Sequence, residues 1–266
     1  MMSQKTHSKN RTITILVLIV ILIILFCLFL FYRINRPLEG TISSIAYNIN
    51  DKNYRVYIKE NDKYVPYLVL DNNYNYTHQT ILLREHALGG QNSIKGYNGT
   101  IDESQIIYDD EKMMGIFLPY EETEVDNFLL NIFPDYFDDD FIEIVNDTEI
   151  DVELGAQYTI KRKFFLLSFQ EVSGEYYPYG KNARQIAYFT NNDLTIENDY
   201  GHEVTWWVRT YGWEDYMFAG YSNLWGAHSG TDTRRSVRPA FTLSGNTKIK
   251  EGYLDDRKNP VYFIDY

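Results

Sequence analysis

The chain almost lacks cysteine. Its 266 residues contain one, Cys27, which stands inside a long apolar run near the N-terminus. The part beyond Pro37 therefore holds neither a disulfide nor a thiol. Secreted animal domains of this size usually carry disulfides, whereas bacterial surface proteins often do not, so the sequence favours a bacterial exterior.

Positive charge is scarce outside the N-terminal segment. The chain has 25 Lys and Arg against 37 Asp and Glu, and its net charge is −12. Five of the basic residues and none of the acidic ones lie within residues 1–36. The remainder carries about −17, which repels phosphate backbones. We expect no nucleic-acid partner.

Motifs for metal binding and catalysis are also missing. The five histidines show no metal-type spacing, and the sequence has neither a recognised nucleophile motif nor a glycine-rich phosphate loop. Residues 138–151 are rich in carboxylates but lack the glycine and the alternating spacing of an EF-hand loop, so they are interpreted as a solvated acidic face. The sequence predicts no metal, no cofactor and no enzymatic activity.

One hydrophobic run is long enough for a membrane span. Residues 13–32 carry no charge, and a helix of this length covers roughly 30 Å, the thickness of a bilayer core. Residues 32–37 offer no small side chain for signal-peptide cleavage, and three basic residues before the run against two after it favour an N-terminus inside. We predict a basic cytoplasmic tail (1–11), a single-pass signal anchor in the cell membrane (12–32), a short linker (33–41) and an extracellular domain (42–266).

Patterning of the ectodomain predicts an α+β fold. Residues 54–59 and 63–70 alternate as two strands around a turn, and residues 80–90 form a further strand or a strand that leads into a loop. Helical spacing begins near Glu121 and ends or kinks at Pro134. Residues 163–169, 205–210 and 237–243 are expected to be strands. The domain is therefore expected to consist of short antiparallel strands, one or two helices and long loops.

Five short stretches resemble, in order, the motifs of a bacterial family of domains of unknown function that is built on a C-type-lectin-like fold. Together they cover about residues 65–245. They are Leu82-Leu83 with Ala87-Leu88, residues 125–133, Phe165-Leu166-Leu167-Ser168 with Glu171, Trp206-Trp207-Val208-Arg209-Thr210, and Ser236-Val237-Arg238-Pro239-Ala240. The chain departs from the motifs with Phe128 in place of Trp and Ser236 in place of Gly.

The resemblance implies a C-type-lectin-like domain but no established reaction. The fold is similar to that of the formylglycine-generating oxidases, which need a cysteine pair to hold copper, and this ectodomain has no cysteine. Calcium-dependent lectins use Glu-Pro-Asn or Gln-Pro-Asp, and neither tripeptide occurs here. Residues 213–215 only loosely resemble the Trp-Asn-Asp motif that accompanies these tripeptides in calcium-dependent lectins.

Two arginine-containing phrases are interpreted as structural. Trp206, Trp207 and Arg209 lie in one predicted strand, and Arg238 lies in another with mostly apolar neighbours. An unpaired charge in such surroundings costs several kcal/mol. We therefore expect both arginines to bind carboxylates or backbone carbonyls, with Glu171 as one partner.

The segment between these phrases, residues 211–235, has a composition of its own. It is rich in Tyr, Trp, Gly, Ser, Asn and Asp, the residues that dominate antibody-like binding surfaces. Aromatic core filling under a long loop remains the alternative. The predicted ligand-binding residues are Trp213, Asp215, Tyr216, Tyr221, Asn223, Trp225, His228 and Asp232.

Two functions follow from the sequence. The first is a membrane-anchored surface module that binds an extracellular glycan, peptide or protein through residues 211–235 without catalysis. The second is a surface enzyme that acts on carbohydrate with paired carboxylates, such as Glu214 or Asp215 with Asp232. Carboxyl groups roughly 5 to 9.5 Å apart across a cleft would favour the enzyme.

Overall fold

The structure is a computed structural model, and it describes a large part of the chain. The described residues are 17–28, 40–49, 54–88, 100–101, 120–154, 156–174, 185–192, 194–211, 216–219, 235–254 and 261–266. The chain forms two compact units, Met1–Leu38 and Glu39–Tyr266.

In the first unit, residues 17–28 form a helix inside the apolar run. None of the helices in the described ranges combines the length and the apolar character needed to cross a bilayer. The other residues of the predicted anchor, 12–16 and 29–32, lie outside the described residues.

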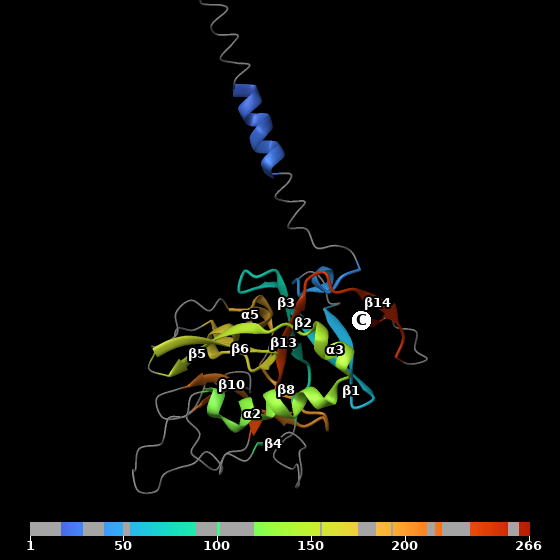
Figure 1. Cartoon of the computed structure of the whole chain (residues 1–266), viewed down its shortest axis with the longest axis vertical. Helices are drawn as coiled ribbons and strands as arrows, with labels where there is room; N and C mark the ends of the chain where they lie inside the picture. The colour runs from blue at the N-terminus through green and yellow to red at the C-terminus, as the bar shows by residue number, and fades with distance from the viewer. Residues whose placement is uncertain are drawn as a thin grey trace, which may run out of the picture. The chain divides into compact units, whose positions relative to one another are not determined.

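The second unit is built on a mixed seven-stranded sheet. Strand β1 pairs with β15 in parallel, and the other neighbours are antiparallel. The strands in sheet order are β14 (Ile249–Gly252), β15 (Val261–Ile264), β1 (Arg55–Glu60), β2 (Lys63–Tyr74), β3 (Gln79–Arg84), β13 (Ala240–Ser244) and β7 (Phe164–Phe165). In Figure 1, β14 and β5 lie on opposite sides of this unit.

Three smaller sheets accompany the main one. The four-stranded sheet runs β11 (Tyr216–Ala219), β10 (Trp206–Tyr211), β12 (Arg235–Ser236) and β4 (Thr100–Ile101). Strands β5 (Thr148–Leu154) and β6 (Ala156–Arg162) form a hairpin, and β8 (Ile196–Glu197) pairs with β9 (Glu203–Val204).

The described helices of this unit are short. They are η1 (Ile42–Ile45), η3 (Tyr120–Glu122), α2 (Glu124–Asn131), η4 (Phe133–Tyr136), α3 (Asp139–Ile144), α4 (Phe169–Ser173) and α5 (Ala187–Asn191). Thr123, Asp138 and Ser168 cap α2, α3 and α4, each by accepting a backbone N–H bond on its side chain. These polar caps fix where each helix begins.

Aromatic rings form the part of the core beneath α2 and α3. Phe133 packs edge-on against Phe164, Phe164 stacks on Phe137, and Phe141 packs edge-on against Phe241. All five rings are buried. These contacts join the helical segment of residues 124–144 to strands β7 and β13.

The structure confirms the predicted α+β class, but two predicted strands are shorter than expected. Strand β7 ends at Phe165 because Ser168 and Glu171 form a reciprocal capping box that begins α4. Strand β13 begins at Ala240, after Pro239, which has no N–H to donate to a ladder. The expected turn after Glu60 is present, and β2 extends to Tyr74.

Candidate functional site

Most of the predicted ligand-binding residues lie outside the described residues. These are Trp213, Asp215, Tyr221, Asn223, Trp225, His228 and Asp232, together with Glu214 of the alternative carboxylate pair. Tyr216 begins β11, whose backbone pairs with β10, and its side chain also falls outside the description. The binding role of residues 211–235 and the proposed carboxylate pair therefore stay predictions.

The described strands bring the chain on both sides of residues 220–234 to strand β10. Trp206 of β10 pairs in parallel with Ser236 of β12, and the Ser236 amide donates to the carbonyl of Thr205 at 2.9 Å. Trp206, Trp207 and Ser236 are all buried. Ala219 of β11 pairs with Trp206 from the other side, so the chain before and after residues 220–234 meets the same buried part of β10.

Arg209 is the buried charge of that base. Its guanidinium lies 2.8 Å from the carboxylate of Glu171 and donates to the carbonyls of Leu166 at 2.6 Å and Asp151 at 2.9 Å. Burial acts to lower the pKa of Arg209, but the Glu171 carboxylate outweighs it and holds that pKa above its ordinary value. Arg209 therefore stays charged and ties β10 to α4 and β5.

Glu171 is saturated with hydrogen bonds. Besides Arg209 it accepts from the hydroxyl of Tyr74 and from the backbone amide of Ser168. Burial acts to raise the pKa of Glu171, and Arg209, Tyr74 and Ser168 together bring it below its ordinary value. Glu171 and these three partners therefore stabilise the fold.

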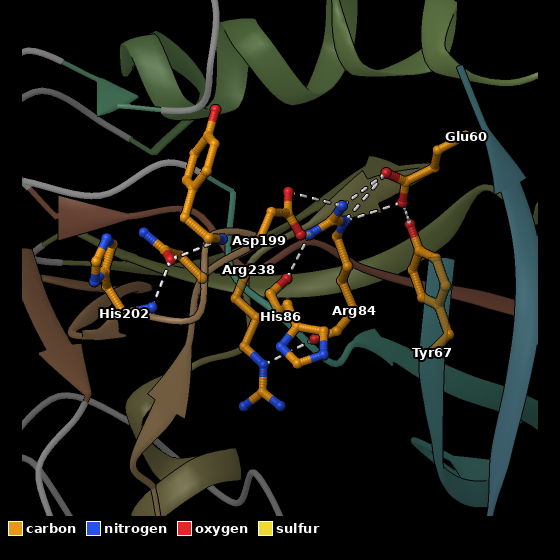
Figure 2. A network of polar contacts seen from close by, with 9 residues as sticks. Glu60, Tyr67, Arg84, His86, Asp199, His202 and Arg238 are labelled. Atoms are coloured by element: carbon orange, nitrogen blue, oxygen red, sulfur yellow. Dashed lines mark hydrogen bonds and ion pairs between the residues drawn. The ribbon is translucent and has the colours of Figure 1, made fainter. Parts of the chain in front are cut away.

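Arg238 is bound differently. Its Nε donates to the carbonyl of Arg84 at 2.9 Å, and its guanidinium carbon lies 5.1 Å from the centre of the Trp206 ring. Among the described residues no carboxylate lies within ion-pair distance of it. Burial lowers the pKa of Arg238 to about 10, although Tyr188 and Glu85 act to raise it. Figure 2 shows its guanidinium pointing away from Glu60 and Asp199.

A second charged network surrounds Arg84, which the sequence analysis did not single out. Arg84 binds Glu60 at 3.0 Å and Asp199 at 2.8 Å, and Tyr67 donates its hydroxyl to Glu60 (Figure 2). Arg84, Glu60 and Tyr67 are buried, whereas the Asp199 side chain is 40% exposed. The sequence signal that could have indicated this network is a charged residue directly after the apolar run 81–83. The network joins β1, β2 and β3 to the β8–β9 turn.

A polar hollow of about 380 Å³ lies beside residues that contact Arg209 and Glu171. Its described walls come from the β2–β3 turn and the β5–β6 hairpin. They are Tyr74, Asn75, Thr77 and Gln79 from the first, and Asp147, Thr148, Glu149, Asp151, Thr159 and Lys161 from the second. Tyr74 donates to Glu171, and Asp151 accepts from Arg209 through its carbonyl, so both walls are fastened to the buried pair.

A chain of hydroxyl groups links the two walls of the hollow. Thr148 Oγ1 lies 2.6 Å from Thr242 Oγ1, which donates to Gln79 Oε1 at 3.0 Å. Thr148 and Thr242 are buried. The oxygen of the Gln79 amide is thereby occupied, and its NH₂ group remains as a donor.

Charge on the β5–β6 wall is mostly negative. Lys161 lies 3.5 Å from Glu149 in an exposed pair, and in the described ranges Asp147 and Asp151 have no cation within ion-pair distance. Partial burial raises the pKa of Asp151, an effect that Arg209 reduces. The carboxylates do not converge, since no group of three His, Cys, Asp or Glu residues among those described is placed to hold a metal ion.

Comparison with known proteins identifies the family of this chain. No curated protein and no solved structure matches the chain. A family model described as "Domain of unknown function (DUF6273)" matches residues 78–245, more than half of the chain. The match includes Arg84, Glu171, Arg209 and Arg238 as well as both strands of the β5–β6 hairpin. The chain belongs to the DUF6273 family of domains of unknown function.

Proposed function

We propose that this protein is a membrane-anchored recognition module of a bacterial surface, with a C-type-lectin-like ectodomain that binds an extracellular glycan, peptide or protein without catalysis. The ligand-binding surface is the segment 211–235. The observation that carries this proposal is the pairing of Trp206 with Ala219 on one side and with Ser236 on the other, which holds the chain on both sides of residues 220–234 against a buried base.

The base supports recognition because it is rigid. Arg209 fastens β10 through one ion pair and two carbonyl bonds, and Arg238 fastens the chain after β12 to the carbonyl of Arg84. Binding residues are disproportionately found on loops that a rigid scaffold positions. Both arginines are buried and occupied, so they serve the scaffold, and the ligand contacts fall to the aromatic segment between them.

Binding is tested with the full-length chain in detergent on glycan and protein arrays. Trp213→Ala and Trp225→Ala should abolish capture of the ligand while the thermal midpoint stays unchanged. Tyr253→Ala is the matched control, since Tyr253 is an exposed aromatic residue outside the segment. A binding surface elsewhere is indicated if the tryptophan variants capture the ligand as well as the control does.

The membrane part of the proposal rests on the uncharged run within residues 12–32. Protease added to intact cells should remove the ectodomain and leave a membrane-bound stub. An ectodomain that becomes cleavable only after lysis would overturn this orientation.

A further inference from the structure

The polar hollow between the β2–β3 turn and the β5–β6 hairpin has the size of a small-molecule site. Its walls are held by contacts that do not involve a ligand: the Thr148–Thr242–Gln79 chain links the two walls, and the Tyr74–Glu171 bond fixes the β2–β3 side. A ligand entering it would meet the side chains of Tyr74, Thr148 and Gln79 already held by hydrogen bonds. Such preorganisation lowers the entropic cost of binding.

The lining excludes two ligand classes. None of the described lining residues is aliphatic, and Tyr74, the one aromatic among them, is buried with its hydroxyl given to Glu171, so an apolar ligand gains little contact area. Three carboxylates face a single Lys161, which is already paired with Glu149, so an anionic ligand is repelled.

The remaining choice is between an organic cation and a neutral hydroxylated ligand. Asp147 and Asp151 offer acceptors, whereas the amide nitrogen of Gln79 and the ammonium of Lys161 offer donors. An ammonium group only donates, so it leaves the donors of the hollow unused. A sugar hydroxyl both donates and accepts, and it satisfies both kinds of group.

The β2–β3 turn, which forms one wall of the hollow, also carries an exposed aromatic residue. Tyr76 lies between the lining residues Asn75 and Thr77, and it is 74% exposed. Its φ of 60° is in the left-handed region, which a bulky residue adopts at a cost of about 1–3 kcal/mol. The face of such a ring is apolar and packs well on the C–H face of a sugar ring.

We infer that this hollow is a binding site for a neutral carbohydrate of monosaccharide to disaccharide size, and that Tyr76 of the β2–β3 turn contacts the sugar. The site involves no residue of the segment 211–235. It is therefore independent of the proposed function, and either can fail without the other.

The test uses the full-length chain in a detergent without a sugar headgroup. The probes are glucose, galactose, mannose, N-acetylglucosamine and their disaccharides. Their binding is measured by saturation-transfer NMR and by titration. At least one should bind, and Asp151→Asn should weaken that binding by about tenfold or more, because a charged acceptor is lost. Glu143→Gln, an exposed carboxylate on α3 outside the lining, is the control and should bind normally.

A second variant separates binding from folding. Tyr76→Gly removes the ring and also relieves the left-handed conformation, so binding should fall while the thermal midpoint stays equal or rises. Asn61→Gly relieves a similar φ of 46° in the β1–β2 turn and should leave binding unchanged. The inference is overturned if no sugar binds, if 1,4-diaminobutane binds and the sugars do not, or if Asp151→Asn and Tyr76→Gly bind as the wild type does.

Discussion

Replacing Arg209 with methionine should destabilise the protein strongly. Met fills a similar elongated space but leaves the Glu171 carboxylate buried without its cation. The side chains of Arg209 and Glu171 are only 2% and 3% exposed, and the ion pair measures 2.8 Å. Breaking a buried pair from one side costs about 3–5 kcal/mol. For a unit of this size that cost lowers the midpoint of thermal unfolding by roughly 10 °C.

The pH dependence identifies Glu171 as the source of the loss. In the wild type its pKa is lowered, so its stabilising contribution is present above the ordinary glutamate pKa and is lost as the pH falls through the folded value. In Arg209→Met, burial without the cation raises this pKa, so the charged carboxylate destabilises the fold above it. The difference in unfolding free energy should therefore be smaller at pH about 4 than at pH about 7.

Urea unfolding followed by tryptophan fluorescence measures these differences. Arg209→Met with Glu171→Gln should cost less than the sum of the single variants by about 1 kcal/mol or more, since the two residues are coupled. Arg55→Met removes the partner of Glu85 in a half-exposed pair and should cost less than about 1 kcal/mol. A loss in Arg209→Met no larger than in this control, or one that is constant with pH, would refute the reasoning.

Three further changes probe other parts of the fold. Ser168→Ala removes the N-cap of α4 and should cost about 1 kcal/mol in urea unfolding, and an unchanged midpoint would mean that the cap is dispensable. Gly252→Ala places a Cβ 2.7 Å from the Phe263 ring and should cost about 1–3 kcal/mol, whereas full stability would show that the ring moves freely. Arg238→Met loses the carbonyl bond to Arg84, the contact with Trp206 and the interaction with Tyr188 but no carboxylate partner among the described residues, so its thermal midpoint should fall less than that of Arg209→Met, and an equal fall would point to a carboxylate partner.

Local patterns predicted the elements that depend on near neighbours. The turn at Asn61 and Asp62 and the helix Glu124–Asn131 follow from residue types within a few positions. The strand predicted over 163–169 was wrong beyond Phe165, because the capping box of Ser168 and Glu171 outweighed the apolar run. That signal was readable, since Ser is followed three residues later by Glu.

The hollow was not predictable in this way. The carboxylates of residues 138–151 read as one acidic face, but only some of them line the hollow, whereas Asp138 caps α3. Alternation in β5 turns Asp151 away from Ile150 and Val152, which are buried. Nothing in the sequence near these residues indicates that the β2–β3 turn forms the other wall.

Composition alone separates a basic, apolar N-terminal segment from an acidic, cysteine-free remainder, because charge and hydropathy are properties of single residues. The sequence also indicated that the buried arginines need partners, because an unpaired buried charge is costly. Which groups act as these partners depends on the tertiary fold. Tyr74 and Glu171 are 97 positions apart, and Arg84 and Asp199 are 115 apart. Contacts over such distances depend on how the strands pair and pack, and no local pattern encodes that choice.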